Sequence, residues 1–163
     1  MSQQFGESDY RNGYSVAVSG VVLSGNKVLL VHALTGDNAG EWEMPGGFVE
    51  TDETIDTAVK REIQEEAGVD AKLDGLIAVR NVIHEAHNDV CFVFLLHAEN
   101  EQTTADGTEV DEAKYFTREE MEKLPNLNKL SHLVITRVFE GDINVQEFCA
   151  HPEMPPSEYV IYL

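Results

Sequence analysis

Two different spacings of apolar residues run along the chain. Segments rich in β-branched and aromatic residues, which are typical of strands, cover 14–23 and 28–33. These two segments flank Ser24-Gly25-Asn26, and a short Gly-containing connection of this kind predicts a β-hairpin. Further strands are expected at 73–83, 90–96 and 113–116.

The spacing changes to that of an α-helix between Thr51 and Gly68. Thr51 is the expected N-cap, Asp52 and Glu53 would place negative charge in the first turn, and Gly68 would end the helix. At about 100° per residue, one side carries an apolar stripe that should face the core. The stripe consists of Ile55, Ala58, Val59 and Ile63.

Two more helices are expected in the C-terminal half. A short one opens at Thr117 and stops before Pro125, and residues 127–139 form another. Strands and helices interleave without a regular βαβ alternation, which favours a mixed β-sheet with helices on both faces. The sequence therefore predicts an α/β fold, an α/β/α sandwich, and its 163 residues fit one domain.

Three glutamates lie in an unusual place on the predicted helix. Glu62 and Glu66 fall inside the apolar stripe, and Glu65 lies on its flank. A charged surface helix is the alternative, but its acidic residues would face away from the stripe. Burying carboxylates together is costly unless a counter-charge neutralises them, so divalent metal ions are expected here.

The spacing around these glutamates resembles a known signature. The segment 47–69 is similar to the motif of the Nudix (MutT-like) hydrolases. In it, five residues separate Gly47 from Glu53, and seven more separate Glu53 from REIQEEAGV (61–69). The resemblance implies the Nudix fold, an α/β/α sandwich, over a domain at 14–140. Residues 1–13 would be an N-terminal extension, and residues 141–163 a C-terminal extension of unknown role. That last segment ends in EYVIYL, which would be an edge strand or a tail.

The resemblance also implies roles for individual residues. Mg2+, for which Mn2+ may substitute, would be held by Glu62, Glu65 and Glu66 together with the backbone carbonyl of Gly46. Glu53 would support the metal site, and Arg61 would orient the carboxylates of the motif.

A further carboxylate is expected from a loop outside the motif. Glu112 matches the family pattern just before the strand at 113–116 and is the expected metal ligand or water activator, with Glu109 as the second choice. Glu62 and Glu112 both remain candidates for the general base.

Four residues are candidates for binding the substrate. Trp42 would stack a base or pack in the core, and packing is favoured. His32 stands where family members often carry an arginine that contacts phosphate. Arg80 and His84, or His87 with Asn88, would replace that contact.

The expected activity is Mg-dependent hydrolysis of a phosphoanhydride bond in a nucleoside diphosphate linked to another moiety. The marks of the ADP-ribose, dinucleoside polyphosphate and NADH subfamilies are missing, which favours nucleoside triphosphates cleaved to monophosphate plus pyrophosphate. An ADP-ribose or nucleotide-sugar pyrophosphatase is the first alternative, and a non-catalytic nucleotide-binding module is the second. An isoprenoid diphosphate isomerase would need a cysteine near the first strands, and Cys91 and Cys149 lie elsewhere.

The charge of the chain argues against some classes of binding partner. Eleven Lys and Arg against 30 Asp and Glu give a net charge of −19, which argues against binding to nucleic acid or anionic membranes. No apolar run approaches the length of a membrane span, and the two cysteines lack metal-binding or redox spacing. A cytoplasmic enzyme acting on a small-molecule nucleotide is expected, and a homodimer is left open.

Overall fold

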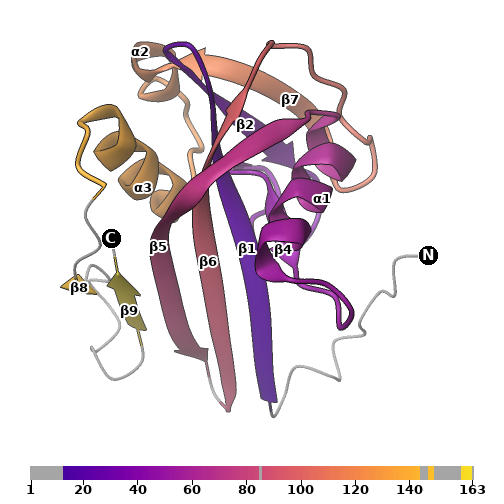
Figure 1. The fold of residues 1–163 in the computed structure, drawn as a ribbon, viewed down its shortest axis with the longest axis vertical. Coiled ribbons are helices and arrows are strands. Elements are labelled where there is room, and N and C mark those ends of the chain that lie inside the picture. The colour runs from indigo at the N-terminus through magenta and orange to yellow at the C-terminus, as the bar shows by residue number, and fades with distance from the viewer. Residues whose placement is uncertain (1–12, 85, 144–146, 149–158, 163) are drawn as a thin grey trace.

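The centre of the molecule is a mixed β-sheet built on three long strands. The computed structural model describes residues 13–84, 86–143, 147–148 and 159–162. Strand β1 (Gly13–Ser24) runs parallel to β6 (His87–Ala98), and β6 pairs antiparallel with β5 (Ala71–His84) (Figure 1). The predicted strands at 73–83 and 90–96 are confirmed, but both are longer and meet in a tight turn.

The predicted hairpin is also confirmed. Strand β2 (Lys27–Ala33) turns back on β1 through Gly25-Asn26, with Gly25 at a φ of 58°, a conformation that favours glycine. Strand β2 then pairs antiparallel with β7 (Val110–Thr117) and with β3 (Trp42–Glu43), while β4 (Gly46–Phe48) pairs with β1. The sheet order is β3-β2-β1-β6-β5, followed by β9 (Tyr159–Tyr162) and β8 (Glu147–Phe148).

Helix α1 (Ile55–Ala67) begins later than the sequence predicted. Its N-cap is Thr54, in an extended conformation, and not Thr51, so the prediction of the helix start was wrong. The reason lies in Glu53, whose side chain accepts a hydrogen bond from the Glu50 N–H at 2.9 Å and thus stabilises a turn ahead of the helix. The C-terminal end is as predicted, with Gly68 in the left-handed conformation at φ 66°.

The helices cover both faces of the sheet, which confirms the predicted α/β/α arrangement. Helix α1 packs on one face, where Val59 and Ile63 join Val18, Val22 and Leu96 in a buried cluster. Helix α3 (Lys129–Phe139) lies on the other side of the sheet (Figure 1) and contributes to a second cluster. This cluster includes Val21, Leu30, Val93, Met121, Val134 and Ile135. The short α2 (Arg118–Met121) starts at Thr117 with a capping box, as expected.

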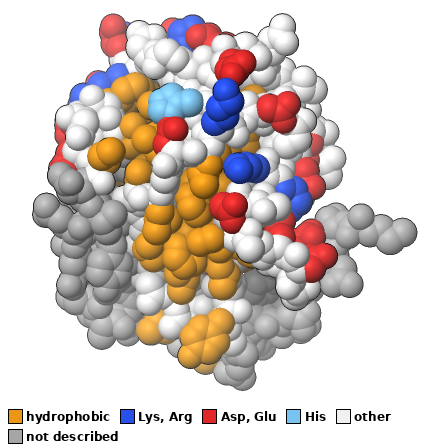
Figure 2. All heavy atoms as spheres, in the orientation of Figure 1, with side chains coloured by type: hydrophobic (Ala, Val, Ile, Leu, Met, Phe, Trp, Pro, Cys, Tyr) orange, Lys and Arg blue, Asp and Glu red, His pale blue; other side chains and the backbone are white. Residues whose placement is uncertain are grey.

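Helix α1 covers only part of its face. Beyond it, the ends of the long strands expose large apolar side chains, with Tyr14 at 83 %, Leu76 at 43 % and Val16 at 39 %. Figure 2 shows apolar side chains gathered over the part of this view where β1, β5 and β6 lie. At the other end of this face of the sheet, α1 covers the strands and closes the buried core.

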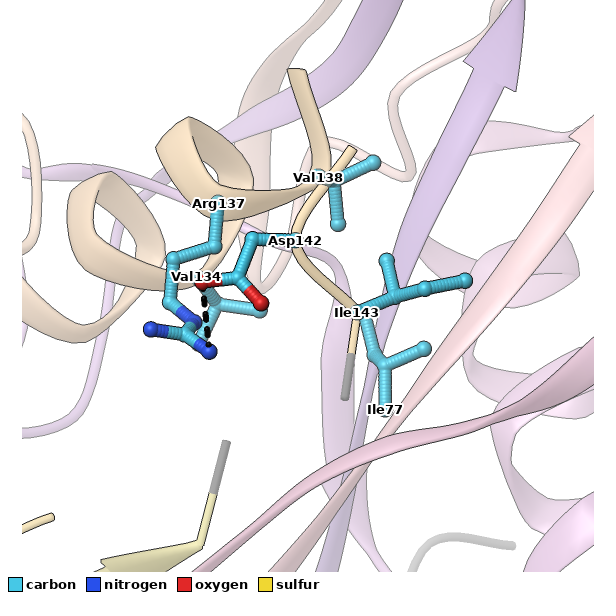
Figure 3. Close-up of a pocket in the computed structure, with 6 residues that line it drawn as sticks. All are labelled: Ile77, Val134, Arg137, Val138, Asp142 and Ile143. Carbon is cyan, nitrogen blue, oxygen red and sulfur yellow. Dashed lines mark ion pairs between the residues drawn. The ribbon is translucent and has the colours of Figure 1, made fainter. Parts of the chain in front are cut away.

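The C-terminal end of α3 is tied to its following loop by an ion pair between Arg137 and Asp142 at 3.1 Å (Figure 3). The crevice beside this pair is lined by apolar side chains of Ile77 on β5 and Val134 on α3, among others. Its volume is about 10 Å³. It has room for about one water molecule and is too small for a substrate.

The C-terminal residues supply strands to the sheet. Strand β9 (Tyr159–Tyr162) pairs antiparallel with β5, and β8 (Glu147–Phe148) pairs with β9. Of the two expectations for EYVIYL, an edge strand or a tail, a strand is observed at Tyr159–Tyr162, but β8 pairs beyond it and forms the edge of the sheet. Cys149 and residues 1–12 lie outside the described residues. Among the helices that are described, none combines the length and apolar character needed to cross a membrane.

The close approach of α1 to β1 generates a first prediction. A Cβ on Gly20 would lie 2.8 Å from Ile63 Cδ1 and 2.9 Å from Leu96 Cδ1. Gly20→Ala should therefore lower the free energy of unfolding by about 1–3 kcal/mol through overpacking. Urea denaturation measures this, with Gly75→Ala as the matched control because a Cβ there meets nothing within 4 Å. Equal stability of the two variants would contradict the packing described here.

Candidate active site

A cavity of about 780 Å³ opens beside α1. Its walls come from four segments: the loop after β2, the β3–β4 region with the turn that follows, one face of α1, and the start of β7. Eight of the described lining residues carry carboxylates, and a single one, Arg61, carries a cationic side chain. The carboxylates belong to Asp37, Glu43, Glu50, Asp52, Glu62, Glu65, Glu66 and Glu109.

Two glycines allow the backbone of β4 to lie directly against the helix carboxylates. The Gly46 N–H donates a hydrogen bond of 2.9 Å to Glu66 Oε2. A Cβ on Gly47 would lie 2.6 Å from Glu62 Oε1, and one on Gly46 would lie 2.2 Å from the Val18 carbonyl oxygen. A side chain at position 47 would therefore fill the space beside Glu62, and one at position 46 would push β4 away from β1.

The glutamates on the core side of α1 are buried as predicted. Glu62 is 7 % exposed and Glu66 is 8 % exposed. Burial raises the pKa of Glu66 to about 9; the Gly46 N–H opposes this shift, and the nearby Glu62, Glu43 and Glu109 add to it. Burial likewise raises the pKa of Glu62 to about 7, against the opposing effect of Arg61. Both groups therefore lack sufficient positive charge around them.

All three guanidinium nitrogens of Arg61 donate hydrogen bonds to residues near the start of α1 and on α1 itself. Its Nη1 donates to Glu62 Oε1 at 2.8 Å and to Glu65 Oε2 at 3.0 Å. Its Nε and Nη2 donate to Glu53, and Nη2 also donates to the Phe48 carbonyl oxygen at 3.1 Å. The hydrogen bonds from Arg61 lower the pKa of Glu53. Arg61 thus links the carboxylates of Glu53, Glu62 and Glu65.

The donor set suits a hard divalent cation. Carboxylate oxygens and the backbone of Gly46 surround the cavity floor, and buried Glu66 needs a counter-charge. Within the described part of the chain, no three His, Cys, Asp or Glu side chains already converge as a complete ligand group. The reason is visible at Arg61, whose Nη1 lies between Glu62 and Glu65. Rotation of the Glu62 and Glu65 side chains away from Nη1 would free both carboxylates to face the cavity, while Arg61 stays bound to Glu53 and Phe48.

The loop carboxylate at the cavity is Glu109, and not Glu112, which the sequence favoured. A β-bulge lies where β2 meets β7, so that His32 pairs with Glu112 but Ala33 pairs with Val110. The bulge interrupts the alternation of the strand, and the Glu112 carboxylate forms an ion pair with Lys114 outside the cavity lining. Glu109 lines the cavity and raises the pKa of both Glu62 and Glu66.

Trp42 and His32 pack together and do not belong to the described lining of the cavity. Their ring centroids are 5.3 Å apart, and Trp42 makes an edge-on contact with Phe116 at 5.0 Å. His32 Nδ1 lies 2.6 Å from Asp111 Oδ1. The favoured prediction of a packing role for Trp42 agrees with this arrangement.

Arg80 and His84 lie on β5, and the described lining of the cavity includes no residue of β5 or β6. Arg80 forms an ion pair with Asp89, and His87 Nε2 lies 2.8 Å from Ser15 Oγ in the same region. His84 pairs through its backbone with His87 at the end of the hairpin, and its side chain is outside the described part. The structure thus does not bring these residues to the glutamates.

Sequence reasoning missed Glu43 and Asn38. Asn38 Nδ2 donates to Glu43 Oε2 at 2.7 Å, which ties the loop after β2 to the cavity wall. Burial raises the pKa of Glu43, and the charge of Glu43 in turn raises that of Glu66. The sequence position of Glu43, just before the Pro45-Gly46-Gly47 turn, could have indicated that it lies near the site.

The sequence profile of the NUDIX domain matches residues 13–138, which is most of the chain. The chain belongs to the Nudix family of hydrolases. A crystal structure of a NUDIX hydrolase from Nitrosomonas europaea is similar, with a TM-score of 0.69 and 28 % identity, covering 80 % of this chain and 72 % of the other. The Nudix resemblance and the Nudix fold expected from the sequence are both confirmed.

Two named relatives match parts of this Nudix chain. An ADP-ribose pyrophosphatase from Methanocaldococcus jannaschii is 34 % identical over 112 residues, 68 % of this chain and 66 % of the relative. A MutT-like protein from Streptomyces ambofaciens is 44 % identical over 66 residues, 40 % of this chain and 42 % of the relative. The chain thus spans less than two thirds of the length of each of these two relatives.

The buried glutamates generate a prediction for stability against pH. A carboxyl group whose folded pKa is raised binds more protons in the folded than in the unfolded protein. Its contribution to stability is complete below the ordinary pKa of 4.5 and is lost as pH rises toward about 9, the folded value for Glu66. With metal removed by a chelator, the melting temperature should therefore be higher at pH 6 than at pH 8.

The control for this experiment is Glu66→Gln, which removes the group with the largest of these raised values. The variant should show a smaller difference in melting temperature between the two pH values. An unchanged or steeper difference in Glu66→Gln would mean that another group causes the dependence. A wild-type melting temperature that falls on acidification from pH 8 to pH 6 would contradict the prediction itself.

Proposed function

We propose that this Nudix chain hydrolyses a phosphoanhydride bond in a nucleoside diphosphate linked to another group, and that it uses Mg2+ or Mn2+. The observation that carries the proposal is the burial of Glu62 and Glu66 at the floor of a large cavity. Such a pair is unfavourable on its own and becomes favourable with a divalent cation and a phosphate group. A non-catalytic module would have no need to keep these carboxylates.

The roles follow from the contacts. Glu62, Glu65, Glu66 and the Gly46 backbone would hold the cation. Bound there, such an ion neutralises phosphate oxygens and lowers the pKa of a water ligand. Glu53 and Phe48 keep hold of Arg61 through its Nε and Nη2 while Nη1 releases the helix carboxylates. Arg61 would then lie next to the substrate, as the one cationic side chain among the described residues that line the cavity.

A general base must receive a proton from the attacking water. Glu109 is our candidate, because its carboxylate is exposed and lines the cavity from the loop before β7, outside α1. Glu62 is the other candidate, since its pKa of about 7 is close to the value that suits a base at neutral pH. The position of Glu109 on this loop favours it over a residue whose oxygens are engaged by Arg61.

The acidity of the cavity bears on the substrate. Eight carboxylates and one arginine oppose the entry of anions, and the opposition grows with the charge of the substrate. A nucleoside triphosphate carries about four negative charges, whereas a diphosphate esterified at both ends carries about two. We therefore propose ADP-ribose or a related nucleoside diphosphate sugar as the substrate, with nucleoside triphosphates as the second candidate. The similarity to the Methanocaldococcus enzyme supports this order, which reverses the expectation from sequence.

The test is a panel of ADP-ribose, nucleotide sugars, dNTPs and NTPs, assayed with Mg2+, with Mn2+ and with a chelator. We expect the highest kcat/KM for ADP-ribose or a nucleotide sugar, and loss of activity in chelator. A triphosphate that exceeds these substrates tenfold would reject the order of substrates and leave the hydrolase activity standing. Undiminished turnover in chelator would reject the metal-dependent proposal.

The matched variant for the panel is Glu66→Gln, which keeps the shape of the side chain and removes its charge. It should lower kcat by about three orders of magnitude, because the ion that activates water would lose a principal ligand. Its melting temperature in chelator should equal or exceed that of the wild type, which shows that the fold is retained. Wild-type turnover would remove Glu66 from the site.

A second pair of variants separates the two loop glutamates. Glu109→Gln should lower kcat by about a hundredfold if this carboxylate receives the proton of the water. Glu112→Gln should leave kcat unchanged, since its carboxylate is paired with Lys114 outside the cavity. Steady-state kinetics of both variants decide, and the reverse outcome would restore Glu112 as the loop carboxylate.

A further inference from the structure

The turn that carries Glu109 is organised by a single carboxylate. Asp106 Oδ1 accepts hydrogen bonds from three successive backbone N–H groups, those of Thr108 at 2.9 Å, Glu109 at 3.0 Å and Val110 at 3.0 Å. Its Oδ2 also accepts from the Glu109 N–H at 3.2 Å. The turn thus closes around one side chain, and Glu109 lies at its middle.

Two backbone contacts hold the same turn against the sheet. The Glu109 carbonyl oxygen accepts from the Leu34 N–H at 2.8 Å, and the Gly107 N–H donates to the Val110 carbonyl oxygen at 2.9 Å. Gly107 has a φ of 72°, a conformation that the sharp reversal requires. The peptide groups on both sides of Glu109 are therefore fixed, and its side chain is directed toward the cavity that it lines.

We infer that Asp106 is a positioning residue, which acts on the reaction through Glu109. A carboxylate on a surface loop would otherwise occupy many positions, and a displacement of about 1 Å can cost a large part of the rate. Asp106 itself is absent from the described cavity lining, so it does not act on the substrate. The inference rests on the proposed function of Glu109 and adds the group that fixes its place.

The geometry separates this role from general stability. Asp106 is exposed, and the backbone N–H groups that it binds all lie within its own turn. Because the three short hydrogen bonds converge on Oδ1, an amide oxygen can replace that atom. Asp106→Asn therefore preserves the three main contacts and removes the charge, whereas Asp106→Ala removes all of them.

The experiment is a double-mutant cycle on the metal-loaded enzyme. We measure kcat, KM and melting temperature for Asp106→Ala, Asp106→Asn, Glu109→Gln and the double variant Asp106→Ala with Glu109→Gln. Thr108→Ala serves as the matched control, because it alters an exposed side chain of the same turn. Asp106→Ala should lower kcat by about tenfold or more with little change in KM, and Asp106→Asn should restore most of it.

The double variant is the decisive comparison. If Asp106 acts through Glu109, the double variant should be no slower than Glu109→Gln alone. Three results would each overturn the inference. The first is a double variant whose loss of kcat is the product of the two single losses, and the second is wild-type kcat in Asp106→Ala. The third is a loss of kcat in Asp106→Asn equal to that in Asp106→Ala, with a normal melting temperature. Should Glu109→Gln alone keep wild-type kcat, the proposed role of Glu109 fails, and the inference falls with it. If Asp106→Ala does not fold, Asp106→Glu replaces it in the cycle, because the longer side chain displaces the acceptor oxygen from the three N–H groups. Wild-type kcat in that variant would overturn the inference.

Discussion

The structure depends on the burial of negative charge on the core side of α1. Glu62 and Glu66 lie among the apolar residues that hold this helix to the sheet, so the same packing that stabilises the fold also removes water from the two carboxylates. On the β4 side, the Gly46 N–H reaches Glu66, and Gly47 leaves free the space beside Glu62 that a Cβ would fill. The buried carboxylates are stabilised by the Gly46 N–H, by Arg61 and, in the proposed enzyme, by a divalent cation.

The burial of the glutamates follows from residue order along one helix and could be predicted from the sequence. The helical spacing places Glu62 and Glu66 on the apolar side, and Gly68 ends the helix, because these features depend on local geometry alone. The start of the helix was missed because a tertiary contact decides it. Arg61 holds the Glu53 side chain in a separate turn with the Glu50 N–H, and the chain is extended at Thr54 before the helix begins.

The loop side of the cavity was predicted less well, for a different physical reason. Which of Glu109 and Glu112 faces the glutamates depends on a single-residue bulge between β2 and β7. A shift of one residue moves a side chain to the other face of a strand, and the spacing of residues in the sequence carries little information about it. Glu43 and Asn38 meet only after the chain has folded, so their hydrogen bond had no local signal.

The parallel pairing of β1 with β6 has a consequence for how the molecule forms. Gly13 pairs with His87 and Leu23 with His97, so this ladder joins residues that are separated by about 74 positions, and α1 lies within the intervening segment. Contacts of such separation form slowly, since a long stretch of chain must be ordered before they stabilise anything. During synthesis, α1 emerges from the ribosome well before β6. The acidic cluster should therefore remain hydrated and charged until the central ladder closes over it, which makes strand pairing the step that creates the site.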